Sequence, residues 1–195
     1  SGGIVAVSGT TKHIERLELD TAAKNTNIFT GAHFGITIDA RKDTTSGISA
    51  ADRATTIKRF ANPSSSADDF SSPGHVTTLK ALPGGVLSRA GHTEASIDLT
   101  RLAGLQPSGV LSMMLSPDGE VAKLSYLKDF AEKHSLLVIT IRDLIAYRRK
   151  SEQLVTNVVT VDFPTKHGHF ELRLYESEID DHHHLAIVKG DVAGD

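Results

Sequence analysis

Four residues at the start of a predicted helix carry groups that could bind an anion: Arg89, Gly91, His92 and Thr93. A helix N-terminus presents unpaired N–H groups and a partial positive charge, so a phosphate group binds well there. The guanidinium of Arg89 can add paired hydrogen bonds, Gly91 lets the backbone approach a ligand, and Thr93 adds a hydroxyl. His92 adds an imidazole that can bind a metal ion or carry a proton. The alternative is structural, with Thr93 as the helix N-cap and Arg89 as a solvated surface charge.

A second imidazole follows the turn signal Pro73-Gly74-His75, on a kinked connection just before a predicted strand at 76–82. A histidine after Pro-Gly is either an exposed turn residue or a group placed for proton transfer. Further upstream, the hydroxyl-rich loop at 42–47 leads into a predicted helix at 49–60, where Ser49 and Asp52 form a capping-box pattern. This loop is a second candidate for anion binding, and an ordinary helix cap is the alternative.

These candidate residues need a scaffold, and the hydrophobic pattern predicts one of alternating strands and helices. Strands are expected at 3–8, 33–40, 76–82, 108–115 (a central strand) and 136–141, and helices at 12–19, 49–60, 92–103, 124–134 and 142–153, with a polar loop at 20–30. The helix after His92 is expected to bury Ala95, Leu99 and Leu102. From residue 154 onward the pattern changes to three antiparallel strands at 155–161, 169–176 and 184–192. We therefore predict an α+β, three-layer fold, a mixed β-sheet covered by helices, followed by a short β-rich extension.

Composition excludes several classes of protein. The 195 residues carry a net charge of −3, which gives no basic surface for nucleic acid. There is no cysteine, so disulfides, thiolate zinc sites and cysteine nucleophiles are excluded. No apolar run approaches the length of a membrane span. We expect a cytoplasmic protein, or one in the lumen of a plastid or mitochondrion.

Several short sequence motifs, which follow one another in the same order as in the family, resemble the 3,4-dihydroxy-2-butanone 4-phosphate synthase of riboflavin biosynthesis. They lie at 1–5, 45–56, 68–76, 84–95, 98–105 and 143–149. The words Phe-Pro-Thr-Lys-His-Gly-His-Phe at 163–170 and His-Leu-Ala-Ile-Val-Lys-Gly-Asp-Val at 184–192 are similar to the opening of GTP cyclohydrolase II, as in bifunctional riboflavin enzymes. The resemblance thus implies a synthase domain at 1–153 and the start of a cyclohydrolase β module at 154–195.

The resemblance also implies a reaction and its residues. The synthase converts D-ribulose 5-phosphate to L-3,4-dihydroxy-2-butanone 4-phosphate and formate, with Mg²⁺ or Mn²⁺, through enolisation, loss of water, a skeletal shift and hydrolysis. His75 is implied as the catalytic residue, and Arg89, Gly91, His92 and Thr93 as the substrate site. His92 is also implied as a metal ligand. Active sites of the family lie at a subunit interface, which implies a homodimer.

Two departures leave an alternative open. The catalytic glutamate of the family falls at Met113, a thioether that cannot transfer a proton. The acidic loop that supplies a metal-binding carboxylate in the family lies upstream of the position of Ser1. The alternative is an inactive paralogue that acts as a structural or regulatory subunit. We also expect a fragment, or a chain whose incomplete sheet is covered by a partner.

Overall fold

The computed structural model describes residues 3–19, 33–179 and 182–192. The chain divides into two compact units, Ser1–Leu144 and Ile145–Asp195. The polar loop predicted at 20–30 lies outside the described residues. No helix in the described part of the chain has the length and apolar character that a membrane crossing requires.

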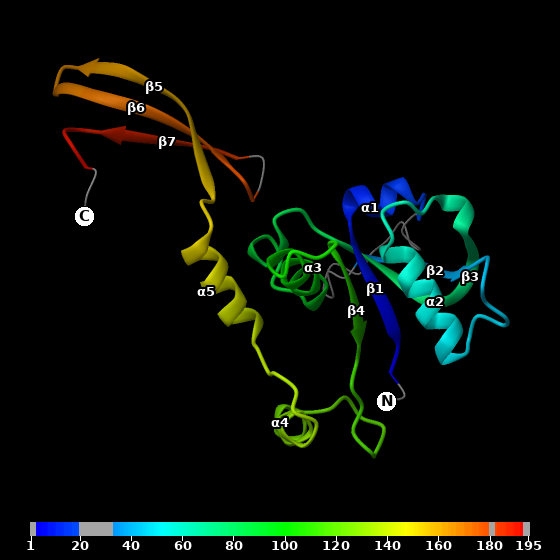
Figure 1. Cartoon of the computed structure of the whole chain (residues 1–195). Helices are drawn as coiled ribbons and strands as arrows, with labels where there is room; N and C mark the ends of the chain where they lie inside the picture. Colours follow the sequence, from blue (N-terminus) through cyan, green and yellow to red (C-terminus); the bar gives the residue numbers. More distant parts are fainter. Residues whose placement is uncertain (1–2, 20–32, 180–181, 193–195) are drawn as a thin grey trace. The chain divides into compact units, whose positions relative to one another are not determined.

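The first unit is built on a mixed four-stranded sheet with the order β2-β3-β1-β4 (Figure 1). Its strands are β1 (Val5–Thr10), β2 (His33–Ala40), β3 (Phe70–Ala81) and β4 (Ser108–Ser112). Strand β1 runs parallel to β3 and antiparallel to β4, while β2 runs antiparallel to β3.

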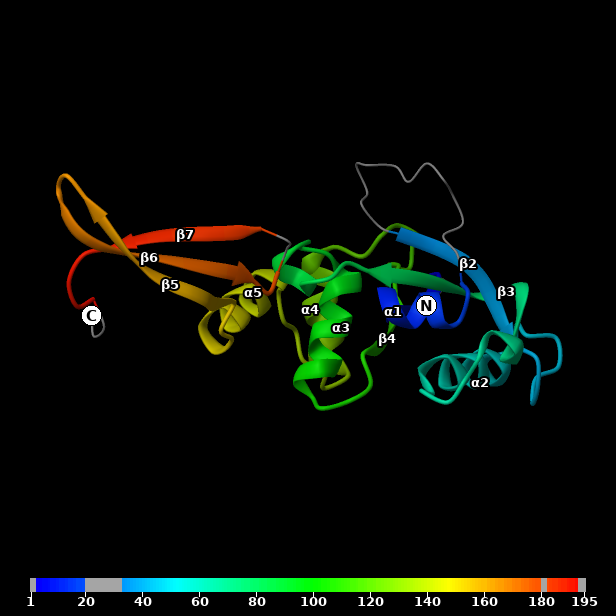
Figure 2. The same ribbon diagram turned by 90° about the horizontal axis from the view of Figure 1, so that it is seen from above.

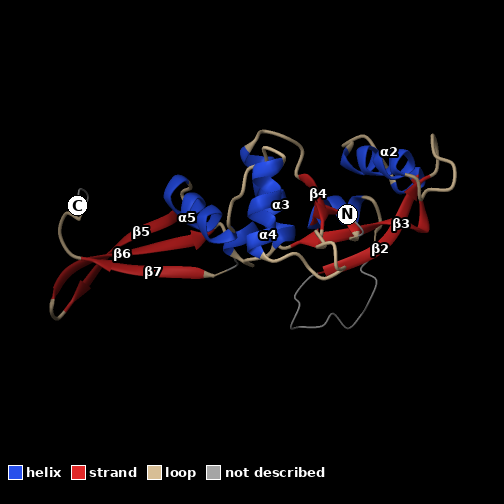
Figure 3. Ribbon diagram, turned by 90° about the horizontal axis from the view of Figure 1, so that it is seen from below, coloured by secondary structure: helices blue, strands red, loops and turns tan. Residues whose placement is uncertain are grey.

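Helices cover both faces of this sheet. They are α1 (Thr11–Arg16), α2 (Ala50–Ala61) and α3 (His92–Leu102). The chain also forms α4 (Leu124–Lys133), α5 (Ile141–Ser151) and two short 3-10 helices, η1 (Ala67–Asp69) and η2 (Gly85–Leu87). Figure 3 shows α2 against β2 and β3, whereas α3 packs on β1, β3 and β4.

Two consecutive residues of β1 identify the layers, because neighbouring side chains of a strand point to opposite faces. Val7 lies in the buried cluster with Ile14 of α1 and Phe60 of α2. The hydroxyl of Ser8 lies 2.6 Å from that of Ser96 on α3. The sheet therefore separates α1 and α2 from α3, which confirms the predicted three-layer α+β architecture.

The predicted cap at Ser49 is confirmed, and Thr10 caps α1 in the same way. The hydroxyl of Thr10 accepts the N–H of His13 at 3.2 Å, and the hydroxyl of Ser49 accepts the N–H of Asp52 at 3.0 Å. Both side chains satisfy N–H groups that a helix leaves unpaired in its first turn.

The β-rich extension is confirmed as a three-stranded antiparallel sheet with the order β5-β6-β7 (Figure 2). Its strands are β5 (Val155–Thr165), β6 (Gly168–Ser177) and β7 (His183–Val188). The hairpin between β5 and β6 brings Thr165 opposite Gly168.

Two strand predictions were wrong. The strand predicted at 108–115 ends at Ser112 and lies at the edge of the described sheet instead of its centre. The strand predicted at 136–141 is absent: residues 136–140 have no regular structure, and Leu137 is 96% exposed. These residues pair with no strand, and the Thr140 hydroxyl accepts the N–H of Asp143 at 3.1 Å at the start of α5.

Candidate functional site

The imidazole of His75 is presented by a bulge inside β3. Along β2, Ile38 pairs with Val76, but the next residue, Asp39, pairs with Ser71, so residues 72–75 are extra on β3. The backbone N–H of Gly74 donates to the Thr37 hydroxyl at 3.1 Å, which ties the bulge to β2. The predicted connection before a strand is thus wrong in one respect, because Pro73-Gly74-His75 lies within the strand. A bulge of this kind redirects a side chain where a regular strand would alternate.

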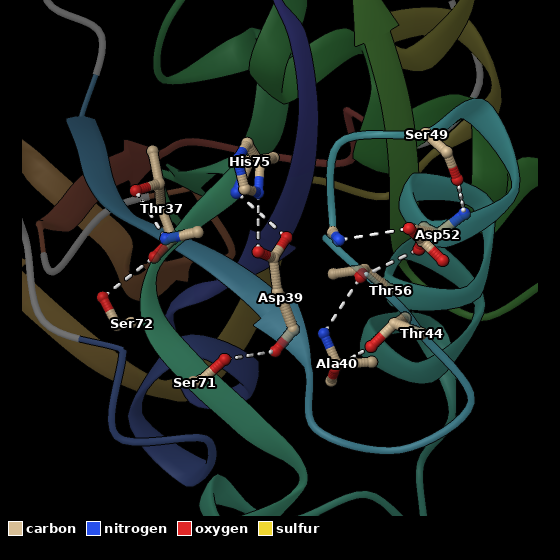
Figure 4. A network of polar contacts seen from close by, with 12 residues as sticks. Thr37, Asp39, Ala40, Thr44, Ser49, Asp52, Thr56, Ser71, Ser72 and His75 are labelled. Carbon is tan, nitrogen blue, oxygen red and sulfur yellow. Dashed lines mark hydrogen bonds and ion pairs between the residues drawn. The ribbon is translucent and has the colours of Figure 1, made fainter.

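Asp39 is the partner of His75. One carboxylate oxygen accepts the backbone N–H of His75 at 3.0 Å, and the other lies 2.7 Å from Nδ1 of its ring. Figure 4 shows the two side chains pointing toward one another from adjacent strands. The side chain of His75 is 40% exposed and that of Asp39 only 14%. The imidazole is therefore accessible to a ligand while its carboxylate partner is largely covered.

The loop at 42–47 closes against this pair. Gly47 is buried with φ +83°, and a Cβ there would overlap the Asp39 carboxylate and lie 2.7 Å from Nδ1 of His75. The loop is held by Asp52, which accepts the N–H of Thr45 at 3.0 Å, its hydroxyl at 2.9 Å and the N–H of Gly47 at 3.1 Å. These hydrogen bonds, those of Thr45 foremost, lower the pKa of Asp52.

Asp52 thus does more than the predicted capping box. It sits in the first turn of α2, where an anionic side chain is favoured, and it organises the loop that precedes the helix. The structure places this loop beside the Asp39–His75 pair.

Arg89 lies in a second cluster, with Glu94 of α3. Its Nη1 lies 2.9 Å from a carboxylate oxygen of Glu94, which is fully buried, and the Arg89 side chain is 21% exposed. A Cβ on Gly91 would lie 2.5 Å from the Glu94 carboxylate and 3.1 Å from the guanidinium carbon of Arg89. The interpretation of Arg89 as a solvated surface charge is therefore wrong, and Gly91 is needed for close packing.

Helix α3 begins at His92, with Gly91 as its N-cap and no side-chain hydrogen bond at the cap. The alternative of Thr93 as the N-cap is therefore wrong: Thr93 is buried within the first turn, and His92 is exposed. The first turn keeps backbone N–H groups that no cap side chain satisfies, which is the arrangement that suits an anion.

The predicted buried face of α3 is only partly right. Ala95 is buried, but Leu99 and Leu102 are 40% and 45% exposed. The acidic residues Glu94 and Asp98 are buried in their place, because they accept backbone N–H groups of Leu82 at 3.1 Å and of Val86 at 2.8 Å. Two carboxylates thus fasten the turn at 82–89 to α3, and apolar spacing alone gave no sign of this.

The structure joins Arg89, Gly91, His92 and Thr93 in one cluster and places His75 in another. Leu82, which contacts Glu94, lies seven residues beyond His75 along β3, so about 20 Å of strand separates the two clusters in one chain. Within residues 3–19, 33–179 and 182–192, no three His, Cys, Asp or Glu side chains lie close enough together to hold a metal ion. His92 offers one imidazole, and magnesium prefers several oxygen ligands, so the described residues do not fit a complete magnesium site.

Met113 follows β4 and is 58% exposed. Its backbone carbonyl packs against Gly3, where a Cβ would overlap it. The residues that the sequence analysis missed are Asp39 and Glu94 as partners of His75 and Arg89. The signal for Asp39 was weak, because its pairing depends on a bulge that joins residues 36 positions apart.

Comparisons with known proteins agree with these features. Residues 1–147 match the 3,4-dihydroxy-2-butanone 4-phosphate synthase family, and residues 156–194 match the GTP cyclohydrolase II family. Riboflavin biosynthesis protein RibBA of Salinispora tropica is 43% identical over 192 residues, 98% of this chain and 48% of its own. The Mycobacterium bovis protein of the same name is 48% identical over 166 residues, 84% of this chain and 39% of its own. The chain thus spans about half the length of the curated relatives it matches.

Solved structures give the same result. RibBX of A. baumannii, a two-domain synthase, has a TM-score of 0.86 and 40% identity over 96% of this chain and 55% of its own. A synthase solved with two magnesium ions has a TM-score of 0.70 and 33% identity over 77% of this chain and 76% of its own. None of these findings supports an inactive paralogue. Residues 156–194 are similar to GTP cyclohydrolase II. The chain belongs to the 3,4-dihydroxy-2-butanone 4-phosphate synthase family of riboflavin biosynthesis.

Proposed function

We propose that the region at 1–153 is the synthase domain that converts D-ribulose 5-phosphate to L-3,4-dihydroxy-2-butanone 4-phosphate and formate. The observation that carries this proposal is the His75 imidazole, accessible on its bulge and paired at 2.7 Å with a covered carboxylate. Enolisation of the sugar moves a proton from carbon to a base and another to the carbonyl oxygen, and an imidazole suits both transfers near neutral pH. His75 is thus the proposed catalytic residue.

The proposed phosphate site is the start of α3. Arg89 supplies a guanidinium whose orientation is set by Glu94, and the uncapped first turn at His92 and Thr93 supplies backbone N–H groups. Gly91 keeps this corner free of a side chain. The substrate of this site is a sugar phosphate, bound by its anionic end.

The proposed requirement for Mg²⁺ or Mn²⁺ rests on the relatives, one of which was solved with two magnesium ions. His92 is the proposed ligand within the described residues, and further oxygen ligands must come from outside them. The proton transfer proposed for His75 and the phosphate binding proposed for Arg89 do not depend on this ion.

A homodimer is the proposed assembly. The cluster around His75 and the cluster around Arg89 are about 20 Å apart along the chain direction of β3. In a dimer, the His75 cluster of one copy could lie beside the Arg89 cluster of the other copy. The bacterial origin of the relatives favours a cytoplasmic location over an organelle.

Release of formate from D-ribulose 5-phosphate, with Mg²⁺, with Mn²⁺ and with a chelator, tests the proposal. The parent protein that contains this chain is the enzyme to assay. Turnover that falls by about 100-fold or more in His75→Ala and Arg89→Ala is expected. The control is His167→Ala, which changes an exposed histidine of the β5–β6 turn.

The variant Met113→Glu tests the alternative that the domain is an inactive paralogue. If the protein releases no formate until a glutamate replaces Met113, the domain is an inactive paralogue. Turnover with Met113 in place would show that the thioether is tolerated.

A further inference from the structure

We infer that Asp39 is the positioning residue of His75, fixing both the direction of its ring and the nitrogen that carries the proton. The inference deepens the proposed function, because it defines which nitrogen of His75 faces the substrate. It rests on two hydrogen bonds from His75 of β3 to the Asp39 carboxylate and on the close approach of Gly47, whose loop is held by Asp52 of α2.

The first step concerns the two oxygens of Asp39. One accepts the backbone N–H of His75 at 3.0 Å, and a backbone N–H can only donate. The other lies 2.7 Å from Nδ1 of the ring, and an ionised carboxylate can only accept. Nδ1 must therefore carry the proton, and Nε2 of the neutral ring is left as the acceptor. One carboxylate thus holds both the main chain and the ring of the same residue.

The second step concerns the opposite wall. Gly47, with φ +83°, approaches both partners so closely that a Cβ would overlap the Asp39 carboxylate and lie 2.7 Å from Nδ1 of His75. The Gly47 N–H and both donors of Thr45 are held by Asp52, which is buried in the first turn of α2. Gly47 therefore lies against the Nδ1 side of the His75 ring. Figure 4 shows the Asp39–His75 pair and, on the neighbouring helix, Asp52 with its hydrogen bonds.

The third step is the consequence of replacing one oxygen by an amide. In Asp39→Asn the single carbonyl oxygen must accept the His75 backbone N–H, because the amide NH₂ cannot. The NH₂ group then faces Nδ1, which must accept, and the ring proton moves to Nε2. The variant keeps the shape of the site and inverts the tautomer, so Nε2 can no longer accept a proton from the substrate.

The decisive measurement is ¹⁵N NMR of His75 in the full chain, at a pH where the imidazole is neutral, with the resonances assigned from a His75→Gln spectrum. We expect a protonated Nδ1 in the wild-type chain and a protonated Nε2 in Asp39→Asn. The matched control is Asp129→Asn, the same change at an exposed side chain of α4, outside the loop at 42–47. It should leave the His75 tautomer as in the wild type.

Kinetics in the parent protein give the second readout. Asp39→Asn should lower kcat for formate release by about 100-fold with little change in KM, because substrate binding does not use this tautomer. Gly47→Ala should lower kcat in the same way, since the added methyl group displaces the pair. Asp129→Asn should keep the wild-type kcat.

The two proposals can fail separately. A wild-type ring protonated on Nε2, or a folded Asp39→Asn chain whose tautomer is unchanged, overturns the role of Asp39 whatever the activity. Wild-type protein that shows the expected tautomers but releases no formate overturns the proposed function and leaves the positioning role in place. If Asp39→Asn fails to fold, the tautomer in the wild type and in Gly47→Ala decides the question.

Discussion

Glu94 serves two neighbours at the scale of a single residue. Its fully buried carboxylate accepts the Leu82 N–H at 3.1 Å and pairs with Nη1 of Arg89 at 2.9 Å. In Glu94→Gln the amide can accept from Leu82, but Arg89 loses its charged partner. We expect a loss of about 2 kcal/mol in the free energy of unfolding, measured with urea. Glu132→Gln on the exposed surface of α4 is the control, and an equal loss in both variants would contradict this role.

His13 gives a pH dependence that can be assigned to one residue. Its burial lowers the pKa, against the effect of the hydrogen bond to the Phe60 carbonyl, which raises it, and with a further lowering by Arg16. The unfolded chain, with a histidine pKa of about 6.5, then binds more protons than the folded one. Stability should therefore fall as the pH drops below about 6.5, until the folded pKa is passed.

The measurement is the difference in Tm between the wild type and His13→Gln at pH 7.5 and pH 5.5. Gln can still donate to Phe60 but does not titrate, so the wild type should lose more stability than the variant as the pH falls. His167→Gln, at an exposed position, should follow the wild-type curve. Parallel curves for the wild type and His13→Gln would show that His13 is not responsible.

At the scale of an element, the loop at 42–47 depends on Asp52. Hydrogen bonds from Thr45 and, to a smaller extent, from Ser49 and Gly47 lower its pKa, so the carboxylate stabilises the fold at neutral pH. This stabilisation should be complete above the unfolded value of about 3.9 and lost as the pH falls through the folded pKa. Asp52→Asn should be less stable than the wild type at pH 7, and the difference should vanish in strong acid. Urea midpoints at pH 7, 4 and 2 test this, and Asp129→Asn at an exposed position of α4 is the control.

The bulge in β3 depends on Gly74. A Cβ there would overlap the β2 backbone at Ile38 and Asp39. Gly74→Ala should therefore separate the two strands and cost about 2 kcal/mol or more. Gly119→Ala is the comparison: its φ is +85° and the space around it is open, so only left-handed strain of about 1 kcal/mol is added. If Gly119→Ala proves the more destabilising in urea unfolding, the bulge does not pack as described.

At the scale of the whole molecule, the predicted division after residue 153 can be tested by truncation. The strands of the second sheet bond only to one another among the described pairs, and α5 spans Ile141–Ser151. A chain of residues 1–153 keeps α5 intact and should unfold cooperatively with a Tm close to that of the same unit in the full chain. A chain of residues 1–144 cuts α5 after its first turn and should melt lower. Circular dichroism that shows no cooperative transition for residues 1–153 would refute the division.

The sequence by itself determined the features that depend on neighbours along the chain. The cap at Ser49 uses a local hydrogen bond to Asp52, so its sequence pattern was sufficient. The same holds for the layered α+β architecture, because strand and helix periods identify elements one at a time. The short motifs that follow one another in the order typical of the synthase also identified the protein family.

Only the tertiary structure decided which polar groups meet. Asp39 reaches His75 through a bulge that shifts the β2–β3 register, and Glu94 and Asp98 are buried because backbone N–H groups of a distant turn need acceptors. The position of a strand at the edge or in the centre of a sheet, as for β4, likewise depends on which strands pair. The physical reason is the same in each case: burying a charged side chain is favourable only where folding brings its partners within hydrogen-bond distance, and no periodicity along the chain records that distance.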